Sequence, residues 1–79
     1  MTAERICSII EEGLADCEAI VENPEGDGVH FQARVMSPVF IGKTRVQQHQ
    51  LVYGALGELM REDIHALALR TYTPEHWPG

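Results

Sequence analysis

One turn-forming segment constrains the fold of this chain more than any other feature of its sequence. The run Asn23-Pro24-Glu25-Gly26-Asp27-Gly28 is dense in residues that favour turns. On each side of it, in residues 17–22 and 29–36, apolar and polar side chains alternate along the chain. Alternation on both sides of a turn predicts two antiparallel strands joined as a β-hairpin. Pro38 should end the second strand, because proline cannot donate a hydrogen bond to a sheet.

Two segments with helical periodicity flank the hairpin. Residues 2–13 should form a helix with Thr2 as its N-cap and Gly13 as its stop signal. Its apolar stripe consists of Ile6, Ile9, Ile10 and Leu14. After a connector at residues 37–44, centred on Gly42, Thr44 should cap a second helix over residues 45–60. The stripe of that helix consists of Val52, Leu56 and Leu59, with Tyr53 and Met60 beside it.

The end of the chain predicts one more strand and a last helical turn. Leu67 and Leu69 alternate with Ala66, Ala68 and Arg70 in a strand over residues 64–71. Pro74 should open a short helical turn that Trp77 packs back onto the body. The predicted fold class is α+β in the order α-β-β-α-β-α. A three-stranded sheet with helices on one face would bury every stripe, in one domain over residues 1–79.

Charge and composition narrow the range of functions. The 79 residues carry a net charge of −6, which argues against tight, sequence-independent binding to phosphate backbones. No acid lies between Asp27 and Glu58, where Arg34, Lys43 and Arg45 occur. This mildly basic middle segment is either an ordinary solvated surface or a docking face for an acidic or thiolate-bearing partner.

Sequence signals for secretion, membranes and catalysis are missing. The N-terminus lacks the apolar core of a signal peptide, and no stretch approaches the ~20 apolar residues of a membrane span. Cys7 and Cys17 form neither a disulfide framework nor a CxxC motif, and we expect structural thiols. No common nucleotide-binding, metalloprotease or hydrolase motif is present. We therefore expect a cytoplasmic protein that is not an enzyme.

Two of the four histidines lie where metal ligands could lie. His30 follows the glycine-rich turn on the polar face of its strand, and His65 opens the third strand. From the residues alone, either could equally be a hydrogen-bonded structural histidine. No further suitable ligand lies nearby in sequence, so a self-contained structural zinc site is not expected. His49 should pack or cap on its helix edge, and His76 should be solvated.

Three blocks of the sequence resemble the BolA family. They are Gly28-Val29-His30-Phe31-Gln32; the run from Phe40-Ile41-Gly42-Lys43-Thr44 to His49-Gln50-Leu51-Val52-Tyr53; and the run from Ile64-His65-Ala66-Leu67 to Thr73-Pro74-Glu75-His76-Trp77. The resemblance covers nearly the whole chain. Its last two blocks are specific, since chance would not readily produce both at this separation.

The resemblance implies a fold like a type II KH domain and a role in iron homeostasis and the stress response. BolA-like proteins pair with monothiol glutaredoxins, with or without a shared [2Fe-2S] cluster. The family's invariant histidine maps onto His65, and the second ligand maps onto His30, as in the histidine-bearing branch of the family. A glutaredoxin cysteine and a glutathione thiolate would complete the ligands, so no cofactor is expected in the isolated chain. Lys43, Arg45 and Arg34 are weaker candidates for contacts with the partner or with phosphate.

The same resemblance implies a rival function. BolA-like proteins have also been described as transcriptional regulators that bind DNA, and KH folds bind single strands through a GXXG loop. Here the corresponding loop has the single glycine Gly42, so that motif is broken. We expect direct binding to DNA to be weak.

Overall fold

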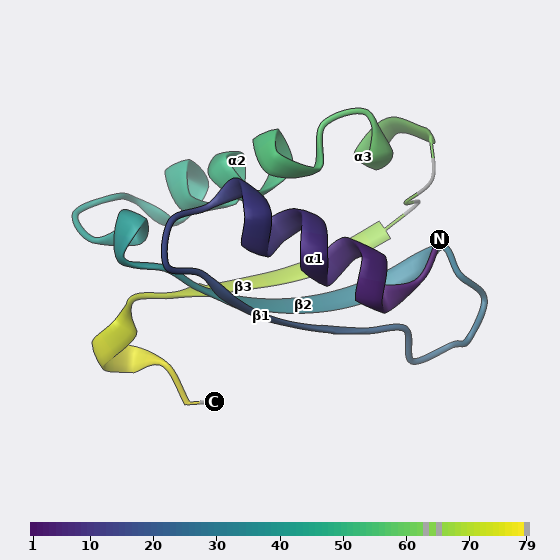
Figure 1. Ribbon diagram of the computed structural model, residues 1–79, viewed down its shortest axis with the longest axis horizontal. Coiled ribbons are helices and arrows are strands. Elements are labelled where there is room, and N and C mark those ends of the chain that lie inside the picture. The colour runs from purple at the N-terminus through teal and green to yellow at the C-terminus, as the bar shows by residue number, and fades with distance from the viewer. Residues whose placement is uncertain (63, 65, 79) are drawn as a thin grey trace.

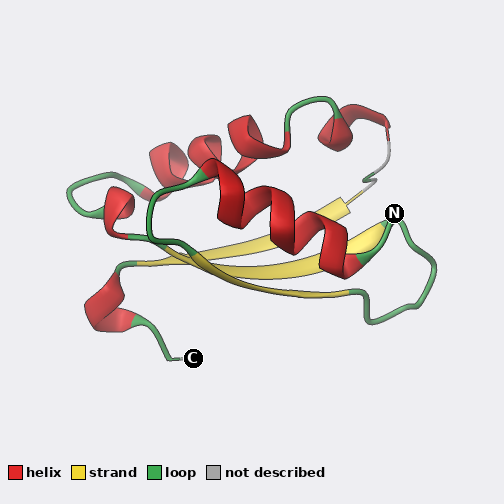
Figure 2. Ribbon diagram, in the orientation of Figure 1, coloured by secondary structure: helices red, strands yellow, loops and turns green. Residues whose placement is uncertain are grey.

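The computed structural model describes residues 1–62, 64 and 66–78. The predicted ligand His65 therefore lies outside the described residues. The helices and strands are α1 (Ala3–Gly13), β1 (Glu18–Glu22), β2 (His30–Met36), α2 (Arg45–Leu56), α3 (Leu59–Glu62) and β3 (Ala66–Tyr72). Two 3-10 helices, Pro38–Phe40 and Pro74–His76, follow β2 and β3. The predicted α+β class is confirmed (Figure 2).

The three strands form one mixed sheet in the order β1-β2-β3. β1 pairs antiparallel with β2 as the predicted hairpin, and β2 pairs parallel with β3. The parallel pairing requires a crossover, which α2 and α3 provide. Figure 1 shows α1 and α2 on the same face of the sheet. On the opposite face, which we call the open face, the described residues form no helix of comparable length, so side chains there face solvent or ligands (Figure 1).

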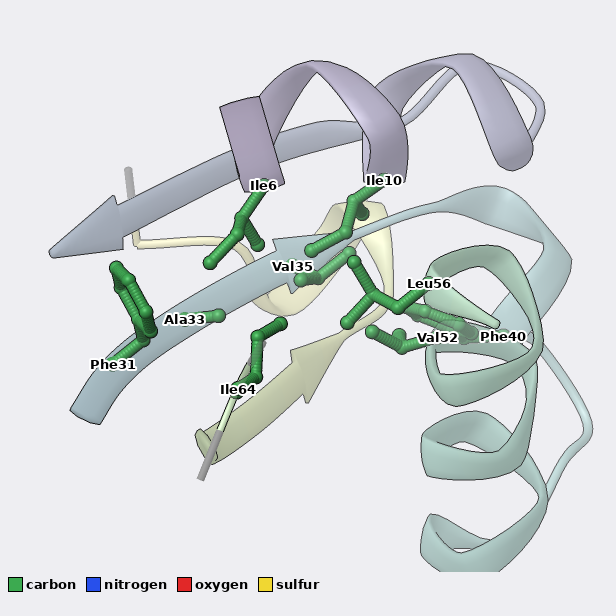
Figure 3. Packing of buried hydrophobic residues seen from close by; sticks show 9 residues of the cluster. All are labelled: Ile6, Ile10, Phe31, Ala33, Val35, Phe40, Val52, Leu56 and Ile64. Carbon is green, nitrogen blue, oxygen red and sulfur yellow. The ribbon is translucent and has the colours of Figure 1, made fainter. Parts of the chain in front are cut away.

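The core lies between the two long helices and the sheet (Figure 3). It consists of Ile6, Ile10, Phe31, Ala33, Val35, Phe40, Val52, Leu56 and Ile64. The alternation along β2 sends Phe31, Ala33 and Val35 into this core, as predicted, and leaves the residues between them on the open face. Burial of these apolar side chains provides the main driving force for the fold.

The ends of α1 confirm one prediction and refine another. Thr2 is the N-cap, because its side chain accepts a hydrogen bond from the backbone N–H of Arg5 at 3.2 Å. Gly13 is the last residue of the helix, but its backbone is not in the left-handed conformation by which a glycine usually ends a helix. A Cβ atom at Gly13 would lie 2.7 Å from Cβ of Ala55 in α2. The glycine therefore lets the two helices approach closely.

The prediction of one helix over residues 45–60 is wrong. Thr44 caps α2 as predicted, in a capping box with Gln47. The helix then stops at Leu56, because Gly57 takes φ +56° and its N–H bonds to the carbonyl of Tyr53. Leu59 begins the separate helix α3. The third strand also starts later than predicted, at Ala66, and Ile64 reaches the core from outside the strand.

The C-terminal segment folds back as predicted. Pro74 begins the last 3-10 helix, and the Trp77 ring packs against Tyr72 with ring centres 5.4 Å apart. The indole N–H of Trp77 also donates to the carboxylate of Glu18 at 2.7 Å. None of the helices in the described part of the chain is long and apolar enough to span a lipid bilayer.

Candidate functional site

The turn between β1 and β2 is held by two polar side chains. One oxygen of Asp27 accepts hydrogen bonds from the backbone N–H groups of Val29 and His30, both at 3.0 Å. Asn23 accepts from the N–H of Gly28 at 3.0 Å and donates to the carbonyl of His30. Gly28 has φ +75°, which favours glycine. These bonds fix the backbone at the point where the chain enters β2.

The second oxygen of Asp27 holds the side chain of His30. It lies 2.5 Å from Nδ1 of the imidazole, and a carboxylate oxygen of Glu25 lies 3.4 Å from the same nitrogen. The hydrogen bond that the imidazole donates to Asp27, followed by the charges of Asp27 and Glu25, raises the pKa of His30. The backbone N–H of Val29 and the His30 side chain in turn lower the pKa of Asp27. Both shifts favour an ion pair at the start of β2.

His30 lies at the rim of a shallow depression on the open face. The depression has a volume of about 360 Å³ and is lined by Pro24, Glu25, His30, Phe31, Gln32, Ala66 and Ala68. Ala66 is the register partner of His30 across the β2–β3 pairing. The other sequence-predicted ligand, His65, lies outside the described residues. The described part of the site is thus one imidazole, oriented by a carboxylate and accessible from solvent.

Both thiols lie away from this turn. Cys7 donates to the carbonyl of Ala19 at 3.2 Å, beside the bond from the Ala19 N–H to Glu11. Burial, followed by the charge of Glu11, raises the pKa of Cys7. The same two causes raise the pKa of Cys17 to about 11. Protonated, half-buried thiols are poor metal ligands and poor nucleophiles, which agrees with the expectation of structural cysteines.

The structure distributes the predicted basic residues around β3. Arg45, at the start of α2, lines a depression of about 410 Å³ with His49 and residues 69–72. Arg34 lies on the open face in β2 and lines a different depression. Arg70 lines both, and sequence reasoning did not select it as a site residue. Alternation placed Arg70 on a polar face, but only the β2–β3 register shows that it pairs with Arg34.

The remaining predicted positions lie in separate places. Lys43 is exposed in the turn before α2, where its carbonyl accepts a hydrogen bond from Gln48 at 3.1 Å. His49 is half-buried and meets the ring of Tyr53 edge-on, at 6.2 Å between centres, in a packing role. His76 is exposed and bonds to the hydroxyl of Thr73 at 2.9 Å. None of these contacts joins the His30 turn.

An imidazole fixed at one nitrogen by a carboxylate is suited to two kinds of chemistry. It can bind a metal ion through the other nitrogen, with the carboxylate setting the tautomer and the ring orientation. It can also take up or release a proton near neutral pH. His30, Asp27 and Glu25 offer atoms within 4.8 Å of one another, but all three are exposed, and such groups are common without a metal.

Comparison with known proteins identifies the same family over most of the chain. Residues 7–76 match the family model described as BolA-like protein. The Acid stress protein IbaG of Escherichia coli strain K12 is 43% identical over 78 residues, 98% of this chain and 89% of that protein. The DNA-binding transcriptional regulator BolA of the same strain is 38% identical over 56 residues, 71% of this chain and 53% of the regulator. A solved bolA protein homologue from Coxiella burnetii is 49% identical, with a TM-score of 0.82, and covers 95% of this chain and 94% of that one.

Proposed function

The chain belongs to the BolA family, and from this premise we propose that it binds a monothiol glutaredoxin and shares a [2Fe-2S] cluster with it, in iron homeostasis and the stress response. The observation that carries the proposal is the exposed His30 imidazole, oriented by Asp27 at the rim of the open face. The similarity to a protein named for acid stress supports the stress-related part. The chain would act by binding and not by catalysis.

This chain could supply two of the four terminal ligands of such a cluster. Two irons need four terminal ligands, and thiolates or imidazoles are the usual ones. His30 and His65 would be the ligands from this chain. Cys7 and Cys17 are held protonated elsewhere, so the two remaining ligands would be a glutaredoxin cysteine and a glutathione thiolate. A shared cluster would therefore require the partner, in line with the sequence-based expectation that this chain forms no self-contained structural zinc site.

Asp27 would set the properties of His30 as a ligand. It holds Nδ1, so Nε2 is the ring nitrogen that would bind iron. The same carboxylate raises the pKa of His30, so a proton competes with the metal at higher pH than for an ordinary histidine. The cluster, when bound, would supply one-electron redox chemistry and transferable iron. The residues of this chain would hold it and make its retention sensitive to pH.

The test is reconstitution with a purified monothiol glutaredoxin, iron, sulfide and glutathione. We expect a coloured heterodimer, measured by visible absorption and by mass in solution. His30→Ala and His65→Ala should each weaken or abolish the visible bands, whereas His76→Ala should not, because His76 is exposed in the C-terminal turn. A colourless mixture in which the two proteins do not associate would refute the proposal. Full colour in both His30→Ala and His65→Ala would refute the ligand assignment alone.

Weak binding to nucleic acid is a second candidate function. The relative named as a DNA-binding transcriptional regulator favours it, as do the exposed cations Lys43 and Arg45 at the start of α2. The net charge of −6 opposes it. We therefore place it second, as an auxiliary property whose test is given in the Discussion.

A further inference from the structure

Two arginines lie side by side in the middle of the open face. Arg34 in β2 and Arg70 in β3 are register partners, so their backbones are one strand spacing apart, roughly 5 Å. Both side chains are exposed on the face opposite the long helices. Like charges on adjacent strands destabilise a sheet. Two of the six Lys and Arg residues in this 79-residue chain therefore lie where their charges repel each other.

Little in the described structure compensates this repulsion. Arg34 has one ion pair, with Glu22, at the long distance of 3.8 Å. The two side chains of that pair are 45% and 58% exposed, so solvent screens the attraction between them. Among the described residues, Arg70 has no salt bridge within 4 Å. An arrangement that costs stability without a structural gain indicates a binding function.

The two guanidinium groups border a common depression. It has a volume of about 250 Å³, and its other lining residues include Gln32, Glu22 and the small Ala68. Ala68 leaves room beside the arginines, and the amide of Gln32 can donate a further hydrogen bond. The depression therefore combines space, two fixed positive charges and a neutral donor.

We propose that Arg34 and Arg70 bind the phosphate group of a small phosphorylated molecule. Each guanidinium presents two parallel donors, and two such groups match the several oxygens of a tetrahedral dianion. A lone carboxylate has only two oxygens, which one arginine satisfies. A long polyanion is disfavoured because it would extend beyond the two arginines over a chain with a net charge of −6.

The surface beside Arg34 indicates what the phosphate is attached to. A neighbouring depression of about 180 Å³ is lined by Ile20, Arg34, Trp77 and Pro78. Arg34 thus borders both depressions, one charged and one largely apolar. A ligand with a phosphate on the arginine pair would place an apolar or planar group against the indole of Trp77. A phosphate ester of a planar organic group, such as a nucleoside monophosphate, has this form.

The test is titration of the iron-free chain at constant ionic strength with inorganic phosphate, AMP and acetate. We expect backbone NMR shifts in β2 and β3 for phosphate and AMP, and none for acetate. AMP should also quench the fluorescence of Trp77, the only tryptophan. Arg34→Gln and Arg70→Gln should each weaken binding at least tenfold. The ligand-free melting temperature of each variant should stay the same or rise, because a repulsion is removed.

Three control variants separate this site from general charge effects. Arg61→Gln makes the same charge change on the exposed surface of α3 and should leave the affinity unchanged. Glu22→Gln should tighten binding. Equal weakening by Arg61→Gln would overturn the proposal, as would equal binding of acetate. Arg45→Ala should leave the affinity for AMP unchanged. If an oligonucleotide binds more tightly than AMP and Arg45→Ala weakens its binding, the surface binds a nucleic-acid strand and the proposal is overturned.

Discussion

Asp27 stabilises the turn and His30 with a single carboxylate, so the turn's stability should depend on pH. The pKa of Asp27 is lowered in the folded chain, so its contribution is present above the ordinary Asp value of about 3.9 and is lost as the pH falls through the folded value. The pKa of His30 is raised, so its contribution is complete below about 6.5 and is lost as the pH rises through the folded value. The ion pair therefore stabilises the fold most between about pH 4 and pH 6.5.

Replacement of Asp27 by Asn tests this window. Asn keeps an acceptor oxygen for the backbone N–H groups but removes the charge. The melting temperature of Asp27→Asn should fall furthest below that of the native chain within the window, and the difference should shrink on both sides. Thermal melts from pH 3 to pH 9 measure it, with Glu12→Gln on α1 as a charge-matched control. A difference that is independent of pH would contradict the ion pair.

The cysteines should be unreactive in the folded protein. The pKa of Cys17 rises from 9.0 to about 11, which lowers its thiolate fraction at pH 8 by about 100-fold. Alkylation by iodoacetamide, followed by mass spectrometry, should be slower by a similar factor than in the denatured chain. The double variant Cys7→Ser, Cys17→Ser should keep the visible spectrum of the shared cluster. Rapid alkylation of Cys17 would contradict the raised pKa of its thiol. Loss of colour in the double variant with the fold intact would contradict the assignment of histidine ligands.

The approach of α1 to α2 depends on the missing side chain of Gly13. Alanine normally favours a helix over glycine by about 1 kcal/mol. At Gly13 the added Cβ would meet Ala55 at 2.7 Å, so Gly13→Ala should instead destabilise the fold by about 1–3 kcal/mol. Urea unfolding measures the change.

Two variants on α2 serve as controls for this contact. Gly54 is exposed, and a Cβ atom there would meet nothing within 4 Å, so Gly54→Ala should stabilise the fold by about 0.5–1 kcal/mol. Adding Ala55→Gly to Gly13→Ala should recover part of the lost stability, because removing the Cβ atom of residue 55 makes room for the new one at residue 13. If Gly13→Ala instead stabilised the fold, α1 and α2 could move apart at little cost, and the prediction would be wrong.

At the level of elements, the sequence predicted what depends on local patterns. The hairpin, the polar face with His30 and Arg34, and the cap at Thr44 follow from alternation and turn chemistry. The stop at Gly57 was missed because a single glycine is tolerated within a helical pattern, and tertiary contacts decide the outcome. The pairing of Arg34 with Arg70 was missed because one sequence does not reveal which strands pair, or in what register.

The arrangement of the whole molecule separates its structural and chemical surfaces. Both long helices cover one face of the sheet, and the core lies between them (Figures 1 and 3). The open face carries His30 and Arg34 on the same strand, β2, four residues apart, and Arg70 lies beside Arg34 on β3. About 13 Å of extended strand separates the two positions. The depressions at His30 and at the arginine pair share Gln32 and Ala68, so a protein partner bound at His30 would cover or border the phosphate position.

The net charge of the whole molecule leads to the last prediction, that binding to nucleic acid is weak and salt-dependent. Three cations, Lys43, Arg45 and Arg34, are the phosphate contacts that the sequence predicts, against a net charge of −6. Three contacts with a single strand give a log–log salt slope of about −2, so doubling the salt should lower the affinity about fourfold. Titration of a labelled oligonucleotide from 50 to 300 mM salt measures both quantities. We expect micromolar or weaker binding near physiological salt; if a sub-micromolar complex forms instead, Lys43→Glu should abolish it. A sub-micromolar, sequence-selective complex would instead make nucleic acid the principal ligand, because a surface this acidic could reach such affinity only through specific contacts with the bases.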